Sequence, residues 1–230
     1  MPMTAHTLDD TACLVVFLKA PARSKRRLAT EIGAAAADAA EYLLACALED
    51  AAAWRGPVTL APAADADADW LAQHASLDHD VVVQDGGSLG GRINHVDRTL
   101  RARGHDRLIF IGADCPLLDD SYLTAAAAAL AHTDAVLGPA VDGGVVLMAS
   151  RRPWPAIDTL SWSTGALRAE LAERLTEHGW SITTLATLTD IDTSGDLAAV
   201  APQLAADARP ARCRLSAWLA ARHRIQSGAA

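Results

Sequence analysis

Two kinds of charged side chain gather in short stretches of this sequence, and together they could hold a phosphorylated ligand. Five cations fall within nine residues of FLKAPARSKRRLA, at positions 19, 23, 25, 26 and 27. Carboxylates occur in ADCPLLDD, VDGG and LTDIDTSGD, and four glycines occur in DGGSLGGR. Cations neutralise phosphate charge, glycines permit close approach of the backbone, and carboxylates offer hard oxygen ligands to Mg²⁺. These residue types are the ones needed to hold a nucleotide phosphate together with a divalent metal.

The cation cluster is unusual because the whole chain is acidic. Its 230 residues carry a formal net charge of -8, with a pI near 5.4. Such a chain lacks the broad basic character expected of a protein that binds nucleic acid or an anionic membrane surface. We therefore interpret the cluster as a local device for one ligand.

The sequence also shows no targeting or membrane signal. No apolar run approaches the roughly 18 to 20 residues that span a bilayer, and MPMTAHTLDD lacks the charged and then apolar pattern of a secretory signal. We therefore expect a cytoplasmic protein.

The elements that must position these stretches alternate between strands and helices. Continuous apolar runs such as CLVVFL and RLIFIG are typical of strands covered on both faces. Segments such as Ala34–Trp54 favour a helix by propensity, and Gly56-Pro57 ends it. The alternation predicts a three-layer α/β/α sandwich around a mostly parallel sheet. Ligands bind such sheets at the carboxyl ends of the strands, and the loops described above follow predicted strands.

Specific boundaries follow from the same patterns. We expect strands over residues 13–18, 57–62, 80–84, 107–112 and 181–188, with two more strands over 134–150. We expect helices over 34–54, 68–75, 89–104, 121–133 and 165–178, with another helix that begins near Ser194. Ser121 is the expected cap of the helix over 121–133.

Length and cysteine usage bound the architecture further. The chain is long enough for a single α/β domain, and no linker-like stretch divides it. We expect that domain over residues 1–200, with a helical extension of the same domain over 201–230 that packs on it. Pairing of that helix with another subunit is the alternative. The four cysteines form no CxxC pair, so neither a disulfide framework nor a zinc site is indicated. Cys115 lies beside Asp114, and we interpret it as a buried small side chain.

The charged loops resemble a group of bacterial transferases. K-A-P-A-R-S-K-R-R-L looks like the loop after the first strand of 2-phospholactate and phosphoenolpyruvate guanylyltransferases, K-x-L/P-x-x-A/S-K-x-R-L. Over roughly Leu14 to Leu197 the chain resembles GT-A-like nucleotidyltransferases and glycosyltransferases with G-x-D-C-P, G-P-a-x-D-G-G, W-S-T and D-x-D-T-x-x-D-L motifs. These motifs stand here at Gly112–Pro116, Gly138–Gly144, Trp162–Thr164 and Asp190–Leu197. The resemblance implies a Rossmann-like GT-A fold that binds a nucleoside triphosphate or a nucleotide sugar.

The resemblance also implies roles for individual residues. The cations of the first loop would neutralise a triphosphate, and the predicted catalytic residues are Lys19, Lys25, Arg27 and Asp114. The predicted contacts to the nucleotide are Gly86, Gly87, Arg92 and Trp162. The predicted ligands of Mg²⁺ or Mn²⁺ are Asp114, Asp142 and Asp192.

Each role has a structural alternative. Asp114 could cap the following turn, and Asp142 could belong only to a tight turn between strands. Among Asp190, Asp192 and Asp196 we expect at least one helix cap and one solvated carboxylate. Trp162 could pack within its loop, and Arg23 and Arg26 are expected to be solvated.

Two departures from the resembled patterns bear on the reaction. The larger group usually carries a loop with a glycine that is two residues longer, and Arg26 stands where a threonine is usual. Ser88 stands where the other pattern, G-D-L-G, has an aspartate. The shorter loop favours a metal-dependent nucleotidyltransferase that transfers an NMP group from an NTP to a small phosphorylated or similar oxyanionic metabolite.

Two other functions stay open. A glycosyltransferase with a nucleotide-sugar donor is the second possibility, and a nucleotide-binding protein without catalysis is the third. In each case we expect a small-molecule ligand, no nucleic acid and no membrane partner, and a monomer or a homodimer.

Overall fold

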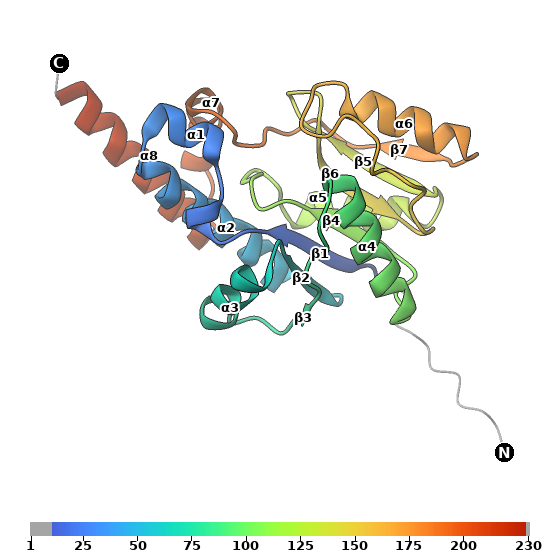
Figure 1. Ribbon diagram of the computed structural model, residues 1–230. Coiled ribbons are helices and arrows are strands. Elements are labelled where there is room, and N and C mark those ends of the chain that lie inside the picture. Colours follow the sequence, from blue (N-terminus) through green and yellow to red (C-terminus); the bar gives the residue numbers. More distant parts are fainter. Residues whose placement is uncertain (1–10, 229–230) are drawn as a thin grey trace.

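One seven-stranded sheet runs through residues 11–228, the part of the chain that the computed structural model describes (Figure 1). The strands are β1 Cys13–Leu18, β2 Val58–Pro62, β3 Asp80–Val81, β4 Leu108–Ile111, β5 Ala135–Pro139, β6 Val145–Ser150 and β7 Ile182–Thr184. Their order is β3-β2-β1-β4-β6-β5-β7, and only β6 runs antiparallel to its two neighbours. The segment MPMTAHTLDD and the last two residues of the predicted extension lie outside the described residues.

The direction of β6 follows from the length of its connection. β5 and β6 are joined by a short turn, which permits only an antiparallel pair, whereas parallel neighbours need a longer crossover. The pairs β1–β2, β1–β4, β2–β3 and β5–β7 are parallel. The predicted mostly parallel sheet is therefore confirmed.

Helices cover both faces of the sheet. They are α1 Arg26–Ile32, α2 Ala35–Ala53, α3 Asp65–His74, α4 Leu89–Ala102, α5 Asp120–Ala129, α6 Leu167–Glu177, α7 Ser194–Ala205 and α8 Pro210–Gly228, with a short 3-10 turn at Pro21–Arg23. Leu44 of α2, Leu71 of α3 and Leu123 of α5 pack on one face. Ile93 of α4 and Leu171 of α6 pack on the other, which gives three layers. Within the described part of the chain, no helix has both the length and the apolar character that crossing a membrane requires.

Some local predictions differ from the structure. The segment predicted as the first loop contains the helix α1. Asp119 rather than Ser121 caps α5, because its Oδ1 accepts the backbone N–H of Tyr122 at 2.8 Å. The two edge strands are shorter than predicted: β3 is limited to Asp80–Val81 and β7 to Ile182–Thr184.

The C-terminal helix α8 is joined to the rest of the molecule by a buried arginine. Arg212 is fully buried and pairs with the carboxylates of Glu49 and Asp50 on α2. It also donates hydrogen bonds to the carbonyls of Pro116 and Leu118, which follow β4. Around it, apolar residues of α2, α7 and α8 form a third apolar cluster, in addition to those on the two faces of the sheet. Helix α7 continues past residue 200, after which the extension is expected to begin. Helix α8 therefore packs on the domain and braces the loop after β4.

Thiol reactivity gives a first test of this interior. Cys13, Cys46 and Cys115 are buried and Cys213 is exposed. Burial, with a contribution from Asp114, raises the pKa of Cys115 to about 12, and the thiolate is the form that reacts. We expect one thiol to react with Ellman's reagent in the native protein and all four in denaturant, read by absorbance. A Cys213→Ser variant that still reacts rapidly when native would contradict this arrangement.

Candidate active site

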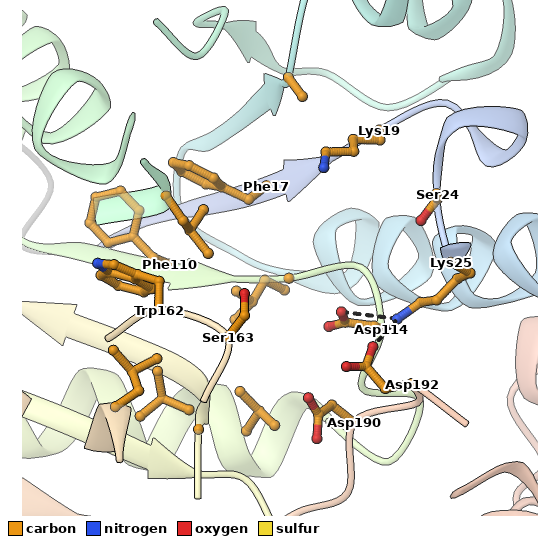
Figure 2. Close-up of a pocket in the computed structure, with 18 of the residues that line it drawn as sticks. Phe17, Lys19, Ser24, Lys25, Phe110, Asp114, Trp162, Ser163, Asp190 and Asp192 are labelled. Carbon is orange, nitrogen blue, oxygen red and sulfur yellow. Dashed lines mark hydrogen bonds and ion pairs between the residues drawn. The ribbon is translucent and has the colours of Figure 1, made fainter. Parts of the chain in front are cut away.

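A pocket of about 780 Å³ opens beyond the carboxyl ends of β1 and β4. Its walls come from the first loop, α4, the β5–β6 turn, the loop before α6 and the segment before α7. Figure 2 shows two unlike ends: Lys25, Asp114, Asp190 and Asp192 gather at one, and Phe17, Phe110 and Trp162 at the other. The position agrees with the rule that ligands bind at the carboxyl ends of parallel strands.

Lys25 joins the first loop to two carboxylates from distant parts of the chain (Figure 2). Its Nζ lies 3.1 Å from Asp114 Oδ2 and 3.4 Å from Asp192 Oδ1, and it also donates to the carbonyl of Ile191. Burial acts to lower the pKa of Lys25, but the charges of Asp114 and Asp192 outweigh it and raise the pKa above the ordinary value. Lys25 is therefore a fixed positive charge at neutral pH.

The backbone at Lys25 directs its side chain inward. With φ 50° and ψ 44°, Lys25 lies in the left-handed region directly before α1. That conformation costs a residue with a side chain about 1–2 kcal/mol, so the surrounding contacts must hold it. Leu28, fully buried in the third apolar cluster, anchors α1 on the other side. The glycine of the longer related loop is absent here, and the turn is made at Lys25 itself.

Three carboxylates lie close together at the end of the pocket that contains Lys25, which we call the acidic end. One oxygen from each of Asp142, Asp190 and Asp192 lies within 4.8 Å of the other two. Burial, followed by the charges of Asp114 and Asp142, raises the pKa of Asp190 to about 6. Hard oxygen atoms at this spacing suit Mg²⁺ or Mn²⁺, since a divalent cation relieves the repulsion among the carboxylates. The donor set therefore fits a hard divalent cation.

Asp190 was not among the predicted metal ligands but belongs to this group of three, whereas the predicted ligand Asp114 does not. Asp114 lies beside the three carboxylates and is engaged by Lys25. The signal for Asp190 was the D-I-D spacing around Ile191, which is fully buried. In an extended segment the residues on either side of a buried one point the opposite way, so both carboxylates can face the pocket.

Asp196 has the structural role expected of one carboxylate in this segment. It forms a capping box with Thr193 at the start of α7. Its Oδ2 also accepts the backbone N–H of Asp192 at 3.0 Å. The cap thus fixes the backbone that carries Asp192 into the pocket.

The remaining cations of the first loop line the pocket beside Lys25. Arg27 lies 3.1 Å from Asp192 Oδ2 and is largely exposed, while the Lys19 side chain projects between Phe17 and the loop (Figure 2). Arg23, expected to be only solvated, lies 3.4 Å from Asp67 of α3. The buried Asp67 also accepts the backbone N–H of Ala20, so it fixes the start of the loop.

The glycine-rich loop before α4 contributes unevenly. Arg92 lines the pocket and its Nε donates to the carbonyl of Gly87, whereas Gly86 and Gly87 lie outside the lining. Ser88 caps α4, since its Oγ accepts the N–H of Gly91 at 3.2 Å. Serine and aspartate are comparable caps, so the serine at this position keeps the helix start that an aspartate would give.

The loop that carries Trp162 is held against α4. The indole N–H of Trp162 donates to the carbonyl of Ile157 at 2.7 Å, and Asn94 bonds the backbone of Pro155 and Ile157. Gly90 permits this approach, because a Cβ there would lie 2.1 Å from the Ile157 oxygen and 2.4 Å from Trp162 Nε1. Packing with α4 therefore fixes Trp162 as one wall of the pocket.

Gly90→Ala tests that packing. We expect a loss of about 1–3 kcal/mol in the free energy of unfolding, because the added methyl group forces the backbone of the Trp162 loop away from α4. Urea denaturation followed by circular dichroism measures it. Gly86→Ala is the matched control, since a Cβ at Gly86 meets nothing within 4 Å. Equal unfolding midpoints for the two variants would contradict the close approach.

A family model matches the middle of the chain. The model described as "Uncharacterized protein conserved in bacteria (DUF2064)" covers residues 46–164, which include the pocket-lining residues of α4, β4 and the loop that contains Trp162. A search of curated proteins returned no match.

Several solved structures share the fold. A protein from Desulfovibrio desulfuricans G20, provisionally assigned as a nucleotide-diphospho-sugar transferase, matches with a TM-score of 0.79 and 24% identity over 90% of this chain and 96% of its own. A nucleotidyl transferase from Methanothermobacter thermautotroptrophicus matches with a TM-score of 0.53 and 17% identity over 89% and 98% of the chains. The synthetase of CMP-2-keto-3-deoxy-manno-octonic acid, solved with CTP, matches with a TM-score of 0.50 and 13% identity over 85% and 98%. At these identities the likeness establishes the fold, and it confirms the predicted GT-A-like architecture.

Proposed function

The chain belongs to the conserved bacterial family described as DUF2064, and we propose that this member is a metal-dependent nucleotidyltransferase. The observation that carries the proposal is the acidic end of the pocket. There Lys25 pairs with Asp114 and Asp192, next to the cluster of three carboxylates described above. Fixed positive charge and hard oxygen ligands side by side at one end of a pocket suit a polyphosphate with a divalent cation. The two kinds of charge come from sequence segments more than 80 residues apart.

The proposed reaction transfers an NMP group from an NTP to an oxyanion of a small acceptor. An acceptor oxygen attacks the α-phosphorus, the bond from that phosphorus to the bridging oxygen breaks, and pyrophosphate leaves with the electron pair. Lys25 and Arg27 hold phosphate oxygens and neutralise their charge, and Lys19 extends the cationic wall. Asp142, Asp190 and Asp192 would hold Mg²⁺ or Mn²⁺, which supplies further charge neutralisation when bound. The contribution of this chain is positioning and electrostatic stabilisation, which can carry most of such a reaction.

The number of cations favours a triphosphate over the diphosphate of a nucleotide sugar. All five cations of the first loop line the pocket: Lys19, Arg23, Lys25, Arg26 and Arg27. A nucleotide sugar carries less phosphate charge and needs fewer partners. We therefore place NTPs before nucleotide sugars as donors.

A ligand-stabilisation screen tests this proposal. The melting temperature is measured in the presence of Mg²⁺ with each of the four NTPs, or with UDP-, GDP- and dTDP-sugars. A ligand at 100 times its dissociation constant adds about 2.7 kcal/mol, so the matching NTP should raise the melting temperature clearly. We expect the largest increase with one NTP. An increase with a nucleotide sugar alone would contradict NMP transfer, and no increase with any nucleotide would contradict nucleotide binding altogether.

A further inference from the structure

The pocket end opposite the carboxylates is built from hydrocarbon. We call it the aromatic chamber and define it by Phe17, Leu89, Ile93, Phe110, Met148 and Trp162, all of which line the pocket. Phe17 and Phe110 meet edge to face, with ring centroids 5.9 Å apart (Figure 2). Except for Leu89, these residues belong to the apolar cluster between the sheet and helices α4 and α6. The chamber is therefore an opening in that cluster rather than part of the charged loop.

Leu89 at the rim of the chamber is exposed to an unusual degree. Its exposed fraction is 42%, and it is one of three large apolar residues that are exposed in the described part of the chain. Leu89 and Ile93 are four residues apart on α4, so they share one face of that helix. A ligand in the chamber would cover Leu89 and gain the free energy of burying it.

Three polar groups beside the chamber already bond within the protein. The indole N–H of Trp162 donates to the carbonyl of Ile157, and the hydroxyl of Thr164 donates to the carbonyl of Ser161. The Nε of Arg92 donates to the carbonyl of Gly87. A nucleobase or a polyol needs partners for its polar edges, whereas a hydrocarbon needs none.

We infer that the aromatic chamber binds the body of the acceptor, and that this body is a hydrophobic group such as an aromatic ring or a branched alkenyl chain. The inference rests on the proposed function and names the substrate class for it. With its body in the chamber, the acceptor directs its oxyanion toward the cations at the other end of the pocket. A volume of about 780 Å³ lies within the range of small-molecule sites and leaves room for a nucleotide beside such an acceptor.

Phosphate monoesters of equal charge and different bodies test the inference. Isothermal titration calorimetry in the presence of Mg²⁺ first measures NTP binding. It then compares the affinity for 2-naphthyl phosphate with the affinity for glycerol 3-phosphate. We expect the naphthyl ester to bind about 10-fold more tightly or better, since an aromatic ring gains burial and ring contacts. Equal affinities for the two esters would overturn the inference, even where an NTP binds. Failure of every NTP to bind would instead contradict the proposed function.

A pair of variants locates the bound ring. Leu89→Ser should weaken naphthyl phosphate binding several-fold and leave glycerol 3-phosphate binding unchanged. Val81→Ser is the matched control, because Val81 is 41% exposed and lies on the edge strand β3, outside the pocket lining. Phe110→Leu removes the ring but keeps an apolar side chain in the sheet, and it should also weaken the binding of naphthyl phosphate. If Phe110→Leu weakened NTP and nucleoside binding instead, the chamber would hold the base and the inference would be wrong.

Discussion

Replacing Lys25 by methionine should lower turnover with an NTP and Mg²⁺ by 100-fold or more. The variant keeps the length of the side chain but loses the fixed charge that lies beside Asp114 and Asp192. Removal of one preorganised group that stabilises developing charge typically costs about 10²–10³ in rate. Both carboxylates are more than a third exposed, so water can solvate them and the fold is expected to persist. Pyrophosphate release measures the rate, and urea denaturation checks the fold.

Two further measurements separate a role in phosphate binding from a general effect of charge. Lys25→Met should weaken NTP binding and leave nucleoside binding unchanged, because the nucleoside has no phosphates. Arg103→Gln is the control, since it removes one exposed positive charge at the end of α4, outside the pocket lining. A Lys25→Met enzyme with normal turnover would remove Lys25 from the site. An equal loss of NTP and nucleoside binding would make its role structural only.

Replacing Arg212 by alanine should lower the free energy of unfolding by about 3–5 kcal/mol, the usual cost of breaking a buried ion pair. The guanidinium is fully buried between Glu49, Asp50 and the carbonyls after β4. Without it, Asp50 is left buried with Arg209 as its remaining cation, at 2.9 Å. Urea denaturation followed by circular dichroism measures the change.

The double variant Arg212→Met with Asp50→Leu shows where that loss originates. It removes both charges and leaves apolar side chains of similar length, so it should be more stable than Arg212→Ala. Cys213→Ser, at the next position on the exposed side of α8, should change stability by less than about 0.5 kcal/mol. A loss below about 1 kcal/mol for Arg212→Ala would contradict the buried pairing.

The sheet and its order of elements could be predicted because their signals are local. CLVVFL and RLIFIG are apolar on both faces, and in the structure both strands lie in the centre of the sheet. The turn that holds Asp142 and the loop that holds Asp114 follow strands, so the sequence placed them at one edge. The cations of the first loop reach the same edge because β1 is paired with β4.

Other features of the site depend on contacts between distant segments, which local patterns do not report. Lys25 meets Asp114 across 89 positions and Asp192 across 167. The same pairings hold Lys25 in a left-handed conformation that propensity would not assign to a lysine. Arg212 looks like a surface residue in a polar helix, and only its packing on α2 and the loop after β4 buries it.

Calorimetric titration of the four NTPs, with Mg²⁺ and then with EDTA, tests the central claim of a metal-dependent triphosphate site most directly. We expect one NTP to bind at a single site with Mg²⁺ and to bind at least about 10-fold more weakly in EDTA, because charge repulsion with the carboxylates is then unrelieved. The same titration of an Asp142→Asn, Asp190→Asn variant should show little dependence on Mg²⁺, since two of the three carboxylates are removed. Equal NTP affinity of the unmodified protein with Mg²⁺ and with EDTA would contradict the claim, as would the absence of binding by every NTP.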